Sequence, residues 1–186
     1  GDTDYIWGTA DVALFEDCDF KCVLDPFKSN KLSYLLVSRT GNPAATTVGK
    51  GYVIYNSRIT MDSGMEVSFG RNAGGADFYD QWAVIDTTIT GDGLQDILWS
   101  YGSSTEPLGI AVDANGNKNV GWKDYNLTLN GKAIDSSAAN AAKHSGAGTI
   151  TASVYNLEYN GRRAILNRVY NLDSKAYEYA TASWDI

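Results

Sequence analysis

Short runs of apolar residues, separated by turn-forming residues, dominate the first half of the chain. Five of these runs are rich in β-branched and aromatic residues and predict β-strands. They cover residues 12–23, 31–38, 51–61, 65–70 and 81–89. Between them lie an Asp-Pro pair, a loop rich in Gly, Pro, Ala and Thr at 40–50, a Ser-Gly turn and the glycine-rich stretch RNAGGAD. This alternation predicts a domain built mainly of strands and tight corners.

Three of the predicted strands share an internal pattern. Each reads apolar, apolar, any residue, Asp or Asn, small residue, polar, apolar, as in LFEDCDF (14–20), VIYNSRI (53–59) and AVIDTTI (83–89). The Asp/Asn position is held by Asp17, Asn56 and Asp86, 39 and then 30 residues apart. Recurrence of a strand-turn unit at such spacing predicts a solenoid. Short polar side chains tolerate the left-handed backbone, so this position predicts a stacked turn.

We therefore expect an all-β protein, a right-handed parallel β-helix with a short helical or loop segment at its C-terminal end. A β-sandwich would need hairpin turns every 8 to 12 residues, and Asn-Gly and Asp-Gly pairs are few. With 186 residues, 44% of them hydrophobic, the chain suffices for one domain with a substantial core. No linker divides it, so residues 1–186 are expected to be a single domain. Trp82 is expected in the core because it lies inside the repeat.

After residue 100 the strand pattern weakens. The stretch DANGNKN at 113–119 departs from a calcium loop, and an Asn-Gly turn is the preferred interpretation. Asn126 begins an N-glycosylation sequon, which matters only in a host that glycosylates. Residues 136–145 form the one short helical candidate, with Ser136 or Ser137 as N-cap and Gly146 after it. The last residues, 174–186, are a candidate short closing helix.

Charge and cysteine content limit the function classes. The net charge of −7 argues against nucleic acid as a partner. No apolar run approaches the roughly 20 residues that span a bilayer. Cys18 and Cys22 are expected to be free: in one continuous strand their Cα atoms would lie about 13 Å apart, beyond disulfide reach. A strand break between them would remove that argument.

Asp4 is the first candidate for chemistry. It lies between short polar residues and the apolar run Tyr5-Ile6-Trp7, which ends at Gly8. A carboxylate beside an apolar wall is a candidate base or nucleophile. An edge-strand aspartate that caps a turn is the alternative, and the residues alone leave both open.

Three ordered segments resemble the pectin methylesterase family. GDTDYIWGTADVALFEDCDF is similar to that family's nucleophile segment, roughly V-D-F-I-F-G-N-A-x-x-V-F-x-N-C-x-I. The positions in register are Asp4, Ile6, Gly8, Ala10, Val12, Phe15 and Cys18. LVSRTGNPAATTVGKGYVIYNSRIT resembles the middle segment, and FGRNA at 69–73 resembles the family's L-G-R-P-W. The match covers about residues 1 to 90 well and the remainder loosely.

The resemblance implies a secreted enzyme without cofactor or metal that hydrolyses the methyl esters of galacturonate in pectin. Asp4 would be the nucleophile, and Arg71 would hold it ionised and oriented by a charge-assisted hydrogen bond. Tyr5 and Trp7 would contribute to a wall on which the sugar packs. The partner is then methyl-esterified homogalacturonan, whose near-neutral character suits an acidic protein better than the polyanionic product does.

Two departures from the family pattern are present. The family's general acid, in a Q-D-T-L-like segment, and its oxyanion-hole glutamines precede the nucleophile, and the chain begins after that segment. We expect an N-terminal companion segment or chain to supply them, with further N-terminal coils and any targeting segment upstream of residue 1. Asp2 and Asp11 are the nearest other carboxylates. Ala73 also stands where the family has a tryptophan that lines the substrate subsite.

Other functional classes have less support. His144 has no serine or cysteine partner in a recognisable motif, and neither G-x-S-x-G nor a metal-ligand cluster occurs. A pectate lyase shares the β-helix but needs an acidic calcium cluster and a basic residue. A catalytically impaired β-helix that binds pectin or a related acidic polysaccharide is the alternative, because Ala73 replaces the tryptophan.

Overall fold

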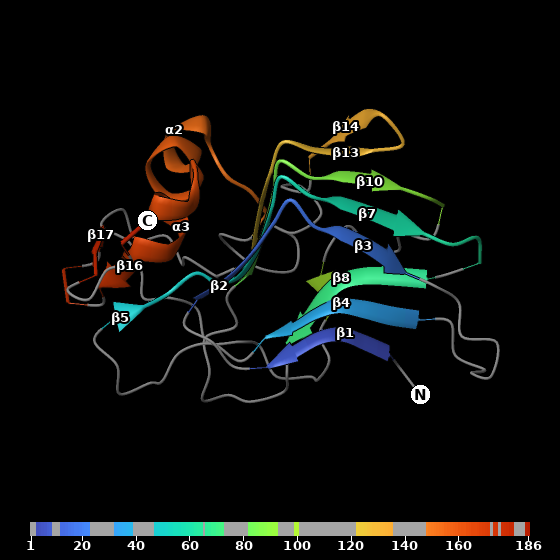
Figure 1. Ribbon diagram of the computed structural model, residues 1–186, viewed down its shortest axis with the longest axis horizontal. Helices are drawn as coiled ribbons and strands as arrows, with labels where there is room; N and C mark the ends of the chain where they lie inside the picture. Colours follow the sequence, from blue (N-terminus) through green and yellow to red (C-terminus); the bar gives the residue numbers. More distant parts are fainter. Residues whose placement is uncertain are drawn as a thin grey trace.

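The computed structural model (Figure 1) describes residues 3–8, 12–22, 32–38, 47–64, 66–72, 82–92, 99–100, 122–135, 148–171, 173–174, 176–180 and 185–186. These residues are mostly strands in parallel sheets with little helix. The expected all-β class is therefore confirmed.

The chain passes four times through three sheets in the same order. The first pass forms β1 (Thr3–Gly8), β2 (Val12–Glu16) and β3 (Asp19–Cys22), and the second forms β4 (Leu32–Ser38), β6 (Gly51–Tyr55) and β7 (Arg58–Met61). The third forms β8 (Glu66–Asn72), β9 (Trp82–Ile85) and β10 (Thr88–Thr90), and the fourth forms β11 (Trp99–Ser100), β12 (Trp122–Tyr125) and β13 (Leu127–Leu129). Within these passes the sheet orders are β1-β4-β8-β11, β12-β9-β6-β2 and β13-β10-β7-β3. Each strand thus pairs in parallel with its counterpart in the next pass.

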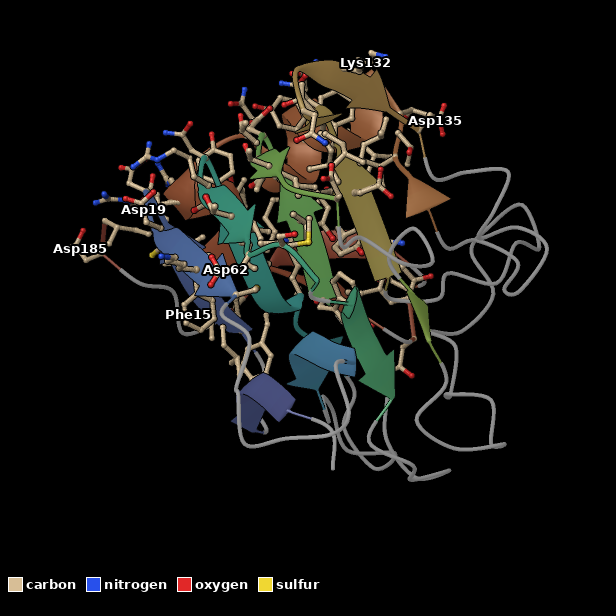
Figure 2. All side chains as sticks on the ribbon, turned by 90° about the vertical axis from the view of Figure 1, so that its right-hand side faces the viewer. Phe15, Asp19, Asp62, Lys132, Asp135 and Asp185 are labelled. Atoms are coloured by element: carbon tan, nitrogen blue, oxygen red, sulfur yellow. The ribbon has the colours of Figure 1, made fainter. Side chains whose placement is uncertain are left out.

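Two short strands extend these sheets after the fourth pass. β14 (Lys132–Ile134) pairs antiparallel with β13, and β15 (Gly148–Thr149) pairs parallel with β12. Figure 2 shows the two ends of the stack, with Phe15 beside the first strands and Lys132 and Asp135 at the opposite end.

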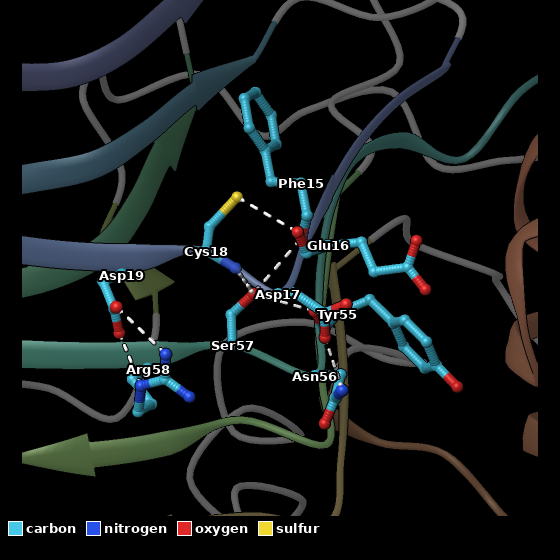
Figure 3. A network of polar contacts seen from close by, with 9 residues as sticks. All are labelled: Phe15, Glu16, Asp17, Cys18, Asp19, Tyr55, Asn56, Ser57 and Arg58. Atoms are coloured by element: carbon cyan, nitrogen blue, oxygen red, sulfur yellow. Dashed lines mark hydrogen bonds and ion pairs between the residues drawn. The ribbon is translucent and has the colours of Figure 1, made fainter.

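The polar corner predicted from the repeat is present in every pass. Asp17, Asn56 and Asp86 have positive φ angles of 55°, 48° and 49°, and Asn126 adds a fourth at 51°. Asn56 donates its side-chain Nδ2 to Asp17 Oδ1 at 2.6 Å (Figure 3), and Asn126 donates to Asp86 Oδ1 at 2.7 Å. The prediction of a stacked left-handed turn is confirmed.

These corners correct the predicted strand lengths. The ranges 12–23, 51–61 and 81–89 are each two strands, because the left-handed residue turns the chain from one sheet into the next. Strands 31–38 and 65–70 correspond to β4 and β8. Asn126, predicted only as a possible sequon, is the corner of a fourth repeat. The sequence pattern does not reveal this repeat, because Lys123 and Asp124 replace the apolar pair and Leu127 replaces the small residue.

The inner core lies between the sheets. Its buried members are Cys22, Tyr52, Ile54, Ile59, Met61, Trp82, Val84, Ile89 and Leu127. Trp82 is 1% exposed, which confirms its expected place in the core. In the row Phe15, Ile54 and Val84, parallel register stacks apolar residues of successive passes directly on one another. Full burial of such a side chain contributes about 1.5–3 kcal/mol.

A second core covers the outer face of the β2-β6-β9-β12 sheet. Val53, Ala83 and Ile85 point to this side and contact Tyr159 and Ile165 of the C-terminal segment. Because both faces of β6 and β9 are buried, these strands read as continuous apolar runs rather than alternating ones.

The C-terminal segment is helical, as the expected fold class allowed, but its described helices lie at 152–167, outside the predicted ranges 136–145 and 174–186. It forms α2 (Ala152–Val154), the π-helical turn η1 (Tyr155–Tyr159) and α3 (Arg162–Asn167), which Figure 1 shows beside the parallel sheets. Thr151 caps α2, its side chain accepting from the Val154 N–H at 3.2 Å. β16 (Arg168–Asn171) then pairs antiparallel with β5 (Thr47–Val48) and β17 (Ala176–Tyr179).

The closing helix expected at 174–186 is wrong where the structure describes it, since residues 176–179 are strand β17. The helical candidate at 136–145 and the loop at 113–119 lie outside the described residues. Cys18 and Cys22 are free, as expected, although β3 begins between them. Within the described residues, no helix has the length and apolar character needed to cross a membrane.

Candidate functional site

The two residues expected to carry the chemistry belong to one sheet. Asp4 lies on β1 and Arg71 on β8, with β4 between them. Asp4 is level with Tyr34, and Tyr34 with Ser68, so Arg71 lies three residues further along its strand. At about 4.8 Å between strands and 3.3 Å per residue, the Cα atoms of Asp4 and Arg71 are about 14 Å apart. Their side chains lie outside the described part of the protein.

The two aromatic candidates flank Ile6 on β1. Ile6 is half-buried and packs against the inner core. Trp7 is level with Val37, which is level with Arg71, so the register brings Trp7 and Arg71 to the same height on the sheet. The side chains of Tyr5 and Trp7 are outside the description.

The departure from the family pattern falls at the end of β8. Asn72 is the last residue of that strand, and Ala73 lies outside the described residues. Among the described residues, His, Cys, Asp and Glu form no group of three or more that suits a metal ion.

A buried ionic network, which the sequence did not predict, joins the corner before β6 to the C-terminal segment. Lys50 is 2% exposed and donates from Nζ to the carbonyl oxygens of Ala164 at 3.1 Å and Arg168 at 2.7 Å. Glu158 lies 3.8 Å from the Lys50 ammonium and accepts two hydrogen bonds from the Arg168 guanidinium, both 2.8 Å. One carboxylate thus serves two buried or half-buried cations.

Aromatic rings complete the surroundings of Lys50. Its Nζ lies 5.5 Å from the ring centre of Tyr159 and 5.2 Å from that of Tyr177. Burial lowers the pKa of Lys50 to about 7, against the opposing effect of Glu158. All the described contacts of Lys50 are internal, so we interpret the network as a clamp that fixes the C-terminal segment to the sheet.

A second polar contact holds the same segment at the corner row. The Tyr155 hydroxyl donates to Asp86 Oδ2 at 2.8 Å, and its ring stacks on Tyr125 with centroids 4.4 Å apart. Burial, together with this bond, raises the pKa of Tyr155. Asp86 therefore has two partners, Asn126 and Tyr155, and serves to position the corner.

A cavity of about 520 Å³ lies at the first pass. It is lined by Val12, Ala13, Leu14, Phe15, Glu16, Cys18, Arg162 and Leu166. Arg162 of α3 forms an ion pair with Glu16 across it. The walls are mainly apolar, and the cavity lies along β2, away from the β1-β4-β8 sheet that carries Asp4 and Arg71.

Comparison of the chain with models of protein families, with curated proteins and with solved structures finds no match.

Proposed function

We propose that the protein is a right-handed parallel β-helix that hydrolyses methyl esters of galacturonate residues in pectin. Asp4 is the nucleophile and Arg71 its partner, with Tyr5 and Trp7 on the sugar-binding wall. The protein acts outside the cell on methyl-esterified homogalacturonan. A companion segment or chain contributes the general acid and the oxyanion donors.

The β-helix is supported by the order of the strands. Four passes contribute to the same three sheets in the same sequence, and each corner repeats one left-handed Asp or Asn. Parallel strands joined by such crossovers are right-handed in nearly all proteins. Stacked passes bury their apolar faces on one another, as solenoid repeats do.

One observation carries the functional proposal: Asp4 and Arg71, which are 67 residues apart in sequence, lie on strands β1 and β8 of one sheet. Two segments that resemble one family's catalytic elements thus contribute strands to one sheet. A carboxyl group acts as a nucleophile only in its ionised form, and a neighbouring guanidinium keeps it ionised by lowering its pKa.

The reaction then has two steps. One Asp4 carboxylate oxygen attacks the C6 carbonyl carbon, and the tetrahedral intermediate collapses to an acyl-enzyme anhydride as methoxide leaves and takes a proton from the general acid. Water, deprotonated by the same group, then cleaves the anhydride and restores the Asp4 carboxylate.

The test is methanol release from esterified pectin by the complete polypeptide that contains these residues. Asp4→Asn should lower kcat by about a thousand-fold or more, because an amide is a poor nucleophile. Arg71→Lys keeps the charge but loses the planar donor fork, and should lower kcat by about ten- to a hundred-fold. Asp19→Asn, a fully exposed carboxylate on β3, is the matched control and should leave the rate unchanged. Equal rates for wild type and Asp4→Asn would remove Asp4 from the mechanism.

A binding β-helix without turnover is the second candidate, favoured by Ala73 at the tryptophan position. Loss of an aromatic platform removes stacking with the sugar ring. Affinity for oligogalacturonides, measured beside methanol release, separates the two: tight binding without turnover favours the binding protein, and robust turnover excludes it.

A further inference from the structure

The burial of equivalent residues changes sharply along the stack. All five residues of β2 are half-buried, whereas every residue of β9 and the first four of β6 are buried. Phe15 is half-exposed although Ile54 and Val84, which occupy the same row, are both 0% exposed. β1, β2 and β3 are the terminal strands of their three sheets. Within the described part of the chain, the first pass therefore has the side chains of an inner layer with no further pass stacked on one side.

Backbone hydrogen bonds show where that neighbour belongs. The Tyr55 carbonyl accepts the N–H of Asp17 at 3.2 Å, and the Ile85 carbonyl accepts the N–H of Asn56 at 3.1 Å. In each case the donor is the left-handed corner residue of the preceding pass. Glu16 is the residue level with Tyr55 in the first pass. Because the Asp17 N–H points to β6, the neighbouring Glu16 carbonyl points to the opposite, open side of β2.

The corner of the first pass is also missing its second bond. From the described side chains, the Glu16 carbonyl accepts the weak thiol donor of Cys18, at 3.3 Å (Figure 3). The Arg58 N–H donates to the Cys18 carbonyl at 2.9 Å, and an equivalent bond joins each later pair of passes. The corresponding N–H in the first pass belongs to Asp19, for which the described residues contain no backbone acceptor. For the two corner bonds, the edge thus presents the Glu16 carbonyl as acceptor and the Asp19 N–H as donor at fixed positions.

The cavity along β2 lies where the strand of a further pass, paired with β2, would fit. Its walls include residues of both β2 faces, Val12 to Phe15, and Arg162 and Leu166 of α3 form another part. A pass stacked there would extend the inner core over Phe15 and the outer core over Leu14. Such a pass should therefore have the residue pattern of the repeat, with apolar residues level with β2 followed by a polar corner residue.

The corner ladder specifies one residue of the occupant. Carboxylate and amide alternate down the row, Asp17, Asn56, Asp86 and Asn126, and each Asn donates to an Asp. Neighbouring strands in a sheet lie about 4.8 Å apart, so two carboxylates at level positions on adjacent strands repel each other. The residue level with Asp17 should be an amide.

We propose that the β1-β2-β3 end is a docking surface for one further polypeptide pass, parallel to β2, with an asparagine level with Asp17. The N–H of its corner asparagine donates to the Glu16 carbonyl, and the carbonyl of the residue directly after that asparagine accepts from the Asp19 N–H. Open parallel edges with apolar surface beneath them bind additional strands in this way. The assignment depends on register and burial alone, and it holds whether or not the protein hydrolyses esters.

The probe is a fluorescein-labelled peptide with the sequence of residues 51–61 of this chain, GYVIYNSRITM, carrying a short lysine tail for solubility. It supplies the apolar run and the corner asparagine. Fluorescence anisotropy with the full 186-residue chain should show saturable binding. The same peptide with Asp in place of Asn should bind about three- to fivefold more weakly, and this difference should shrink in 1 M salt.

Hydrogen exchange locates the peptide. Alternate residues of a central parallel strand point their N–H groups to opposite neighbours. Because the Asp17 N–H points to β6, those of Val12, Leu14 and Glu16 point to the open side. These amides and that of Asp19 should become protected on binding.

A proline variant supplies the protein-side test. Leu14→Pro removes an outward N–H and should abolish binding while leaving the β2–β6 hydrogen bonds in place. Tyr179→Pro is the matched control: Ala180 donates to the Asn167 carbonyl at 2.7 Å, so the Tyr179 N–H on edge strand β17 points outward. Should Leu14→Pro fail to fold, the Asn and Asp peptides still decide.

Two results would overturn the proposal. One is binding that does not distinguish the Asn from the Asp peptide, or that leaves the β2 amides unprotected. The other is a concentration-dependent dimer of the chain, seen by sedimentation, with the β2 amides already protected without peptide, because the occupant is then a second copy.

Discussion

Replacing Lys50 by methionine tests whether the buried clamp makes stability depend on pH. Methionine has a similar length but no charge and no donors, so Lys50→Met removes the ammonium from between Glu158 and the Ala164 and Arg168 carbonyls. In the folded protein, burial lowers the pKa of Lys50 from its ordinary 10.5 to about 7. In the unfolded chain the lysine regains its ordinary pKa.

The sign follows from proton uptake. Between pH 7 and 10.5 the unfolded chain binds a proton that the folded protein has largely released, so stability rises with pH across this window. At pH 7 the folded lysine is half protonated, and at pH 9 it is neutral. At 1.36 kcal/mol per pH unit for a whole proton, the gain from pH 7 to pH 9 is about 2 kcal/mol.

Urea unfolding followed by tryptophan fluorescence at pH 7, 8 and 9 measures this gain. Wild type should gain about 2 kcal/mol more than Lys50→Met. Burial also lowers the pKa of Lys123, to about 8, but that residue is present in both proteins and its contribution cancels. Lys21→Met, at a lysine whose side chain is 68% exposed, should retain the wild-type slope. Parallel slopes for wild type and Lys50→Met would refute the reasoning, since Lys50 would then keep its ordinary pKa.

Urea titration at pH 7 tests three further changes. Glu158→Gln leaves Lys50 and Arg168 without their shared carboxylate and should lower the free energy of unfolding by about 3–5 kcal/mol. Glu178→Gln, at an exposed residue, should change it by no more than about 0.5 kcal/mol. Equal effects of the two changes would show that the clamp contributes nothing to stability. Gly91→Ala should lower the free energy of unfolding by at least about 2 kcal/mol, because the added Cβ would lie 2.7 Å from the β7 backbone. Gly64→Ala, also at positive φ but in open space, should lower it by about 1 kcal/mol. A smaller loss for Gly91→Ala than for Gly64→Ala would contradict the close packing at Gly91. Asn56→Ala should lower the free energy of unfolding by about 1–2 kcal/mol, and Asn56→Gly should lower it clearly less, because only the alanine strains the left-handed corner. A larger loss for Asn56→Gly would exclude backbone strain as the cause.

The sequence signals for the candidate site differ from those for the fold. The apolar run beside Asp4 makes it a candidate for chemistry, but its role as nucleophile and the choice of Arg71 come from the resemblance of their segments to one family. What the register adds is that β1 and β8 share a sheet with one strand between them. The network of Lys50, Glu158 and Arg168 had no signal at all, because its members lie in a loop, a π-helical turn and a strand end.

The amino-acid sequence by itself determined the corners and the strands beside them. An Asp or Asn after an apolar run favours the left-handed backbone through local sterics and hydrogen bonds, so the pattern could be read at Asp17, Asn56 and Asp86. The tertiary structure alone decided the features that depend on distant partners. Asn126 is recognisable as a fourth corner only through its bond to Asp86, and Lys50 is held by carbonyls more than 110 residues away. The helices over the outer face were missed for the same reason: short helices are stabilised by packing on Val53, Ala83 and Ile85 rather than by their own propensity.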